Sequence, residues 1–203
     1  MSLQERIDRG LDFAAFIARY AERDARWELH DGEAFAMAGG SPEHGALALN
    51  AAVALRAIFR PRGCEVFAFD VYVRADGDDY NAMLPDVFVR CGPRPPANAR
   101  YLSDPVLIVE VLSPSTMDFD RGEKLTRYKA MASVQHIMLV YQGEARVEVF
   151  ERPEDEAAAD RDEDGRVVWP VSVRSGPDGE IPLTRLDASL SLADIYDGVA
   201  IPR

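Results

Sequence analysis

The sequence predicts an α+β domain (mixed α/β), in which helices flank a mixed sheet. Three observations indicate this class. The chain has 203 residues, a length that usually folds as one domain. Segments with helical or strand spacing follow one another in the order helix, hairpin, helix, several strands, helix, strands. Residues 106–112, VLIVEVL, are almost continuously apolar, which is typical of a strand buried on both faces. We therefore expect a single domain over residues 1–203 with this strand at its centre.

The N-terminal quarter of the chain carries clear local signals. Residues 1–25 are expected to form an N-terminal helix, because apolar positions recur at helical spacing over residues 7–24. WELHDGEAFAMAGG follows and alternates around Asp31-Gly32, a turn dipeptide that predicts a hairpin. A largely buried helix comes next, with Ser41 as N-cap, Pro42 at the first helical position and Gly63 after its end.

The rest of the chain is expected to supply most of the sheet. Strands are predicted at CEVFAFDVYVRA (64–75) and MLPDVFVR (83–90), before the central strand. A helix is predicted at RGEKLTRYKAMAS (121–133), and VQHIMLVY (134–141) with ARVEVFER (145–152) reads as a hairpin. VVWPVSVRS (167–175), GEIPLTRL (179–186) and SLADIYDG (191–198) complete the pattern.

Composition excludes several classes of protein. No stretch approaches the roughly 20 apolar residues that span a bilayer, and the N-terminus lacks a signal-peptide core. A cytoplasmic protein without a membrane association is therefore expected. Cys64 and Cys91 belong to no CxxC pair and are expected to be reduced, half-buried strand residues rather than a disulfide. The histidines His30, His44 and His136 are too scattered to predict a zinc centre.

The net charge of −12 argues against a protein that coats nucleic acid generally. The charge is unevenly distributed, however. Residues 151–165, ERPEDEAAADRDEDG, hold eight acids and two bases, a local charge of −6, and are expected to form a solvated acidic loop. Half of the acidity therefore lies in one loop, and a local basic cleft elsewhere remains compatible with the sequence.

Glu110 lies in the middle of the central apolar strand, where a charged and unpaired carboxylate would cost several kcal/mol. Protonation, a cation or a metal ion could each relieve that cost. Asp86 begins another apolar strand, directly after Pro85. Lys124 lies in the helix that follows Glu110 and shares a face of that helix with Tyr128. If the helix packs back on the sheet, Lys124 can reach the strand that carries Glu110.

Two carboxylates and one ammonium are a set of groups that can support metal-dependent hydrolysis of a phosphodiester bond. Carboxylates hold Mg²⁺ through hard oxygen ligands and leave positions for water and a substrate phosphate. The metal activates water and neutralises the charge that develops at phosphorus, while a lysine stabilises that charge or orients the water. The same three residues could instead form a structural cluster, in which Glu110 is paired with Lys124 or an arginine and has no catalytic role.

PDVFV at 85–89, PVLIVEVLSPST at 105–116 and DxxxKLTRY at 120–128 resemble the Uma-type family of restriction-endonuclease-like proteins, within the PD-(D/E)XK nuclease superfamily. WELHDGEAFAMAGGSPEHGALALN at 27–50 and SLADIYDGV at 191–199 also fit, so the resemblance covers the chain from about residue 10 to the end. The superfamily usually has lysine two positions after the glutamate, where this chain has Leu112. The family resemblance implies that the lysine has moved to the following helix, at Lys124.

This resemblance implies a restriction-endonuclease-like fold and a set of site residues. Asp86 and Glu110 would be metal ligands together with the backbone carbonyl of Val111, and Lys124 would be the catalytic lysine. The metal would be Mg²⁺, with Mn²⁺ as an alternative, the substrate DNA and the assembly a homodimer. Secondary site residues are expected among Glu33, His44 and Tyr128.

Two other functions stay open at the level of sequence. One is a non-catalytic dimeric binding or regulatory protein that retains the nuclease fold and keeps its acids for structure, which the acidic charge balance favours. The other is a nuclease for RNA or another phosphodiester, because the chemistry at the metal would be the same.

Overall fold

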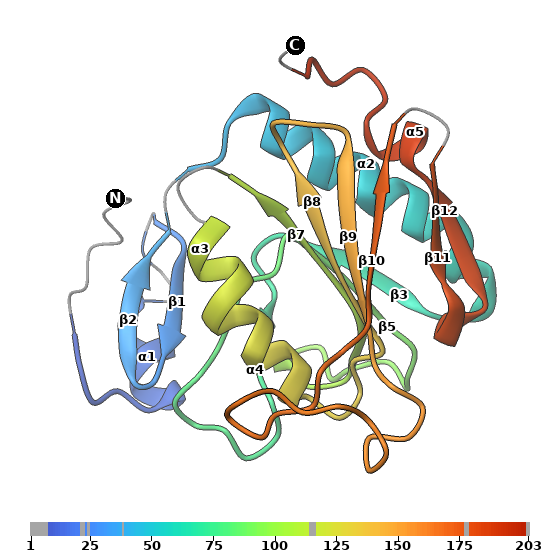
Figure 1. Ribbon diagram of the computed structural model, residues 1–203. Helices are drawn as coiled ribbons and strands as arrows, with labels where there is room; N and C mark the ends of the chain where they lie inside the picture. The colour runs from blue at the N-terminus through green and yellow to red at the C-terminus, as the bar shows by residue number, and fades with distance from the viewer. Residues whose placement is uncertain are drawn as a thin grey trace.

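The chain folds around a six-stranded mixed sheet, with helices on both of its faces (Figure 1). The computed structural model describes residues 8–20, 23, 25–37, 39–113, 117–176 and 179–201. Strand order in the sheet is β10-β9-β8-β7-β5-β3. The strands are β3 (Glu65–Ala68), β5 (Val87–Arg90), β7 (Pro105–Leu112), β8 (His136–Tyr141), β9 (Arg146–Glu151) and β10 (Val171–Ser175). The predicted mixed α+β class is confirmed.

β7 is an interior strand, as its apolar run predicts. It pairs antiparallel with β5 and parallel with β8, and seven of its eight residues are buried. The other neighbouring pairs, β3 with β5, β8 with β9 and β9 with β10, are antiparallel. A parallel pair needs a crossover between its strands, and residues 113–135 supply it. That crossover carries Lys124.

One face of the sheet is covered by α2 (Pro42–Phe59). The hydroxyl of Ser41 accepts a hydrogen bond from the backbone N–H of His44 at 3.2 Å, so the predicted N-cap is confirmed. A short 3-10 helix, Arg60–Arg62, follows α2, and Gly63 ends it at φ 80°. The hairpin of β11 (Glu180–Leu183) and β12 (Ala188–Ser191), with α5 (Leu192–Ile195), completes this layer.

The opposite face is covered by the crossover segment. It runs through α3 (Met117–Phe119), a π-helical turn at Asp120–Lys124 and α4 (Leu125–Ala130). Leu125 and Tyr128 pack from this segment against Ile108 and Leu112 of β7. The predicted helix is therefore present, but its first half is wound with i→i+5 hydrogen bonds, shown by the N–H of Leu125 donating to the carbonyl of Asp120.

A third, smaller core joins the N-terminal elements to the rest. α1 (Phe13–Tyr20) packs on the hairpin of β1 (Trp27–His30) and β2 (Glu33–Ala36). Asp31 (φ 49°) and Gly32 (φ 76°) form the turn that the sequence predicts. Of the N-terminal helix expected over residues 1–25, Phe13–Tyr20 is helical and residues 8–12 are not, while residues 1–7, 21, 22 and 24 lie outside the described part of the chain. A two-stranded parallel pair, β4 (Tyr72–Val73) with β6 (Tyr101–Leu102), lies between this module and the sheet.

Cys64 and Cys91 form a disulfide, so the prediction of two reduced cysteines is wrong. The cause is the pairing of β3 with β5. Glu65 lies opposite Arg90 in this antiparallel pair, so the next positions outward, Cys64 and Cys91, also face each other. Their Cα atoms are 4.3 Å apart.

The longest described helix, α2, has 18 residues. Over the parts of the chain that the structure describes, every helix falls short of the combined length and apolar character needed to cross a membrane.

Candidate active site

Asp86 and Glu110 meet because their strands are antiparallel neighbours. Val87 of β5 lies opposite Val109 of β7, so the preceding residue on one strand faces the following residue on the other. The backbone N–H of Val111 donates to Asp86 Oδ2 at 2.8 Å, and the N–H of Asp86 lies 3.4 Å from Glu110 Oε2. Both side chains are nearly inaccessible, with exposures of 7% for Asp86 and 4% for Glu110.

Lys124 reaches the same place from the end of the π-helical turn. Its Nζ lies 3.2 Å from Glu110 Oε1 and 3.5 Å from Asp120 Oδ1. One turn further along, the hydroxyl of Tyr128 donates to Glu110 Oε1 at 2.6 Å. The sequence-predicted Asp86, Glu110, Lys124 and Tyr128 are therefore brought together, on two strands and one helical segment.

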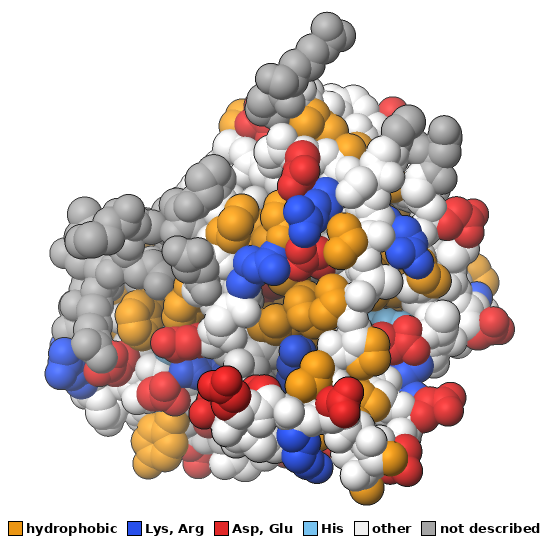
Figure 2. Space-filling view, viewed as in Figure 1, with side chains coloured by type: hydrophobic (Ala, Val, Ile, Leu, Met, Phe, Trp, Pro, Cys, Tyr) orange, Lys and Arg blue, Asp and Glu red, His pale blue; other side chains and the backbone are white. Residues whose placement is uncertain are grey.

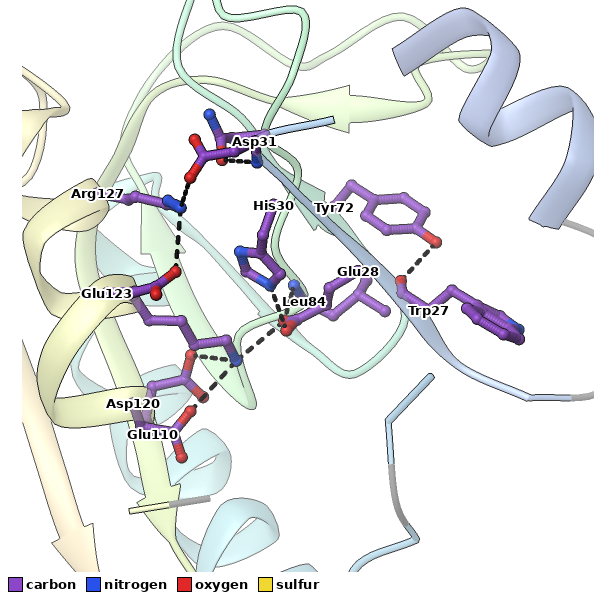
Figure 3. Close-up of polar contacts among 12 residues, drawn as sticks. Trp27, Glu28, His30, Asp31, Tyr72, Leu84, Glu110, Asp120, Glu123 and Arg127 are labelled. Atoms are coloured by element: carbon purple, nitrogen blue, oxygen red, sulfur yellow. Dashed lines mark hydrogen bonds and ion pairs between the residues drawn. The ribbon is translucent and has the colours of Figure 1, made fainter. Parts of the chain in front are cut away.

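Glu28 is a member of this cluster that sequence reasoning missed. Its Oε1 lies 2.9 Å from Lys124 Nζ, closer than either other carboxylate, and accepts the backbone N–H of Leu84 at 2.7 Å. Its Oε2 lies 3.0 Å from His30 Nε2. Figure 3 shows Glu28, Glu110 and Asp120 pointing toward one another from β1, β7 and the π-helical turn.

The signal for Glu28 was present in the hairpin. Glu28 and His30 alternate along WELH and therefore point to the same side of β1, and all four residues of that strand are buried. A strand that buries both a glutamate and a histidine requires polar partners for them.

His44 and Glu33, the other proposed secondary residues, lie in different surroundings. His44, in the first turn of α2, places Nε2 3.0 Å from Asp86 Oδ1. Glu33 forms an ion pair with Arg9, at 3.3 Å between Oε1 and Nε. The carboxylate by which the N-terminal hairpin reaches Lys124 is thus Glu28, five residues before Glu33.

The cluster holds more negative than positive charge. Three carboxylates, those of Glu28, Glu110 and Asp120, contact the one lysine, and a fourth, that of Asp86, lies beside Glu110. Burial, reinforced by the charges of Asp86, Asp120 and Glu28, outweighs the attraction of Lys124 and raises the pKa of Glu110 to about 8. At neutral pH the cluster therefore favours a proton or another cation at Glu110.

Burial and the same cluster of charges also shift the pKa values of the groups around Glu110. Burial opposes the charged form of Glu28, but Lys124, His30 and the Leu84 N–H together lower its pKa to about 2. For Lys124, burial is outweighed by Glu110, Glu28 and Asp120, so its pKa lies well above the usual value and the ammonium is retained. Burial and the nearby Glu110 raise the pKa of Tyr128 far above its usual value, which keeps the hydroxyl a hydrogen-bond donor.

The donor set fits a divalent cation of the Mg²⁺ type. Mg²⁺ is commonly held by one or two carboxylates and keeps several of its waters. Among the described residues, no group of three or more His, Cys, Asp and Glu side chains is arranged to hold a metal. The oxygen donors that such an ion could use here are the adjacent carboxylates of Asp86 and Glu110, and the excess negative charge of the cluster favours a cation.

Comparisons with other proteins show similarity in fold and in sequence. A solved structure described as "a putative nuclease belonging to DUF820" from Anabaena variabilis superposes with a TM-score of 0.70, over 94% of this chain and 100% of that one. Sequence identity is 18%, so this similarity shows the fold. Two proteins of Synechocystis sp., the uncharacterized proteins slr1290 and sll1609, are each 30% identical to the chain. The matches span 128 residues (63% of this chain, 67% of slr1290) and 148 residues (71% of this chain, 82% of sll1609).

The sequence pattern of one family covers most of the chain. The pattern of Uma2, described as "Putative restriction endonuclease", matches residues 13–173, which include Glu28, Asp86, Glu110 and Lys124. The chain belongs to the Uma2 family of restriction-endonuclease-like proteins.

Proposed function

We propose that this protein is a Mg²⁺-dependent endodeoxyribonuclease that hydrolyses phosphodiester bonds of DNA. The observation that carries the proposal is the convergence of two carboxylates on adjacent strands, Asp86 and Glu110, with one lysine that lies 3.2 Å from Glu110. Membership of a family described as a restriction endonuclease supports the nuclease class. Metal dependence and catalysis are part of the proposal.

Each residue has a separate role in this proposal. Asp86, Glu110 and the Val111 carbonyl would hold Mg²⁺, which, when bound, activates water and neutralises charge on the phosphoryl group. The ammonium of Lys124 stabilises the negative charge that develops on the phosphoryl oxygens or orients the attacking water. Tyr128 holds Glu110 Oε1 through a 2.6 Å hydrogen bond.

Two more contacts fix the orientation of these groups. His44 Nε2 lies 3.0 Å from Asp86 Oδ1 and limits rotation of that carboxylate. Glu28 lies 2.9 Å from Lys124 Nζ and positions the ammonium from the side opposite β7. Positioning of this kind matters because a displacement of about 1 Å at a reacting group can cost about 100-fold in rate.

Plasmid cleavage tests the proposal. The wild-type protein is expected to nick or linearise supercoiled DNA with Mg²⁺ or Mn²⁺ and to be inactive with EDTA. Asp86→Asn, Glu110→Gln and Lys124→Met should each lower the rate by at least about 100-fold. An RNA of the same sequence, tested in parallel, separates a deoxyribonuclease from a nuclease of broader substrate range.

The chain offers a matched control for the lysine variant. Its two lysines, Lys124 and Lys129, lie on the same helical segment. Lys129 Nζ lies 4.7 Å from the centre of the Phe150 ring, outside the carboxylate cluster. Lys129→Met should therefore retain cleavage. An inert wild type under all metal conditions, or full activity in Glu110→Gln, would remove the catalytic proposal.

One observation favours a second function, a non-catalytic dimeric binding or regulatory protein with the nuclease fold. The side chains of Lys124 (3%), Glu110 (4%) and Asp86 (7%) are almost fully enclosed. Such a cluster also satisfies the requirements of a structural ion-pair network. DNA binding without cleavage in any metal, unchanged by Glu110→Gln, would support this second function.

The homodimer belongs to the same proposal. Leu49 and Val53, one helical turn apart on α2, are 56% and 60% exposed, and large exposed apolar side chains at this spacing suit an interface between two copies. Light scattering during size-exclusion chromatography tests this, with Leu49→Glu and Val53→Glu expected to give monomers.

Cytoplasmic location is likewise a proposal. Disulfides persist mainly in oxidising compartments, so the Cys64–Cys91 bond would be reduced or only transiently formed in a reducing cytoplasm. Cell fractionation combined with thiol labelling would establish both the compartment and the oxidation state of the cysteines there.

A further inference from the structure

A second buried carboxylate, Glu148 of β9, is held by two arginines and a tyrosine. It is 3% exposed. Its Oε1 accepts hydrogen bonds from Tyr141 OH at 2.8 Å and from Arg146 Nη2 at 2.6 Å. Its Oε2 lies 2.8 Å from Arg121 Nη1. The two arginine side chains nevertheless remain 39% (Arg121) and 34% (Arg146) exposed, so each is anchored to Glu148 while part of it stays accessible to solvent.

The ring of Tyr141 further fixes both guanidinium groups. The Cζ atom of Arg146 lies 4.7 Å from the ring centre and that of Arg121 lies 5.8 Å from it. Arg121 Nη1 also donates to the hydroxyl of Tyr141. An arginine that is already ordered loses less conformational entropy when it binds an anion, and its planar array of donors matches phosphate oxygens.

The charges at this position leave capacity for an anion. Two guanidiniums face one buried carboxylate, Glu148. Arg146 also approaches Glu144, whose Oε1 lies 3.4 Å from Nη1 and whose side chain is 57% exposed. An ion pair of that length and exposure is weak in water, so an incoming phosphate can compete with it.

The arginine pair lies beside the candidate active site. Glu110, Leu139 and Glu148 lie directly opposite one another on β7, β8 and β9, so all three side chains point to the same face of the sheet. With about 5 Å between strands, the backbones at Glu110 and Glu148 are roughly 10 Å apart. Arg121 belongs to the π-helical turn that ends at Lys124.

Charged side chains also gather on the molecular surface in the region of the arginine pair. Figure 2 shows basic side chains next to acidic ones on the part of the sheet between the α3–α4 segment and β10, a region left open by the crossover helix. The carboxyl ends of parallel strands, here β7 and β8, are where ligands commonly bind in sheets that contain such pairs.

We propose that Arg121 and Arg146 form a binding site for a DNA backbone phosphate that flanks the phosphodiester held at Asp86 and Glu110. This proposal rests on the proposed nuclease function and names a substrate contact for it. Such a contact reads no base sequence; it positions the strand. It also explains how a chain with a net charge of −12 can hold a polyanion, since two anchored cations stand beside the acidic cluster.

The salt dependence of DNA binding tests the site. Binding of a fluorescent, mixed-sequence DNA duplex is measured by anisotropy over a KCl series, with Ca²⁺ in place of Mg²⁺ to limit cleavage. The double variant Arg121→Gln/Arg146→Gln should bind at least about tenfold more weakly. The slope of log K against log [KCl] should become shallower by about one for each phosphate that the variant no longer neutralises.

A matched control and a conservative variant accompany this measurement. Arg56 is exposed on α2, which covers the opposite face of the sheet, so Arg56→Gln should leave both affinity and slope unchanged. Arg121→Lys/Arg146→Lys keeps both charges and should preserve most of the slope. If the double glutamine variant does not fold, as judged by thermal unfolding, Arg146→Gln alone decides, because Arg121 still pairs with Glu148 in that variant.

The possible results separate this site from the nuclease proposal. If the wild-type protein binds and cleaves DNA while the glutamine variants keep its slope and affinity, the phosphate site is overturned and the nuclease proposal stands. If the wild type neither binds nor cleaves DNA, both are overturned. Weaker binding with a shallower slope in the glutamine variants, and neither change in Arg56→Gln, supports the site.

Discussion

Glu28 and Lys124 form an ion pair with 2.9 Å between Oε1 and Nζ, and neither side chain is more than 3% exposed. This pair links the N-terminal hairpin to the crossover helix across the candidate site. Glu110 and Asp120 also contact the same ammonium. Removal of Glu28 therefore takes away the closest partner of Lys124 and leaves two other carboxylates in contact with it.

We predict that Glu28→Gln lowers the rate of DNA cleavage by at least about tenfold and reduces stability. The rate falls because Lys124 is deprived of its closest anionic partner and moves toward Glu110 and Asp120. Stability falls because the pairing between a buried ammonium and a carboxylate is removed, although two carboxylates remain. Plasmid cleavage and urea unfolding measure the two effects.

Glu33→Gln is the control for this prediction. Glu33 lies on the same hairpin and forms an ion pair with Arg9, whose side chain is 71% exposed. This variant should change cleavage less than Glu28→Gln does. Equal losses in both variants would show that the hairpin acts only through general stability.

Divalent cations should stabilise the folded protein through Asp86 and Glu110. An ion that binds only the folded state adds about 2.7 kcal/mol when its concentration is 100 times its Kd. Thermal unfolding with and without Mg²⁺ or Ca²⁺ measures this. Glu110→Gln should abolish the shift because it removes a carboxylate ligand, and it should cost little stability without metal because burial already opposes the charged form of Glu110 and raises its pKa.

Glu123→Gln is the matched control for the cation effect. Glu123 lies in the π-helical turn with Lys124, but its side chain is 60% exposed and pairs with Arg127. It should keep the full cation-induced shift in Tm. A shift that survives in both Asp86→Asn and Glu110→Gln would place the ion elsewhere on this acidic chain.

The Cys64–Cys91 disulfide should contribute to stability by restricting the unfolded chain. It closes a loop with a sequence separation of 27 residues, for which the chain-entropy estimate is about 3.5 kcal/mol. That loop contains Asp86, so the bond also limits the chain on which this carboxylate lies. Urea unfolding with and without a thiol reductant, and of Cys64→Ser/Cys91→Ser, should show this loss; identical midpoints in all samples would contradict it.

Local signals explain which parts of the fold could be predicted. The Asp31-Gly32 turn and the Ser41 cap depend on a few adjacent residues, and both form as predicted. Asp86 and Glu110 can be singled out as candidates because an acid in or beside an apolar strand is conspicuous in the sequence. The central position of β7 follows from the same apolar run.

The features of the fold and the site that local patterns do not predict depend mainly on contacts between distant segments. The contact of Glu28 with Lys124 requires the hairpin to dock beside the crossover helix, which no local pattern specifies. The disulfide depends on the register of β3 against β5. The π-helical turn has nearly the same spacing of apolar residues as an α-helix, so the sequence predicts a helix there without its widened winding.

His136 should make stability fall as the pH is lowered. It is fully buried at the start of β8, where Nε2 accepts the backbone N–H of Arg185. Burial, aided by Arg185 and opposed by Glu151, lowers its pKa to about 4. The folded state therefore keeps the ring neutral, whereas the unfolded chain takes up a proton below about pH 6.5. This contribution is fully present above that pH and is lost as the pH falls toward 4, by on the order of 2 kcal/mol.

Urea unfolding at pH 7 and pH 4.5 measures this loss of stability. His136→Gln, which can still accept the Arg185 N–H but does not titrate, should show a smaller loss. An equal loss in the variant would assign the acid sensitivity to other groups.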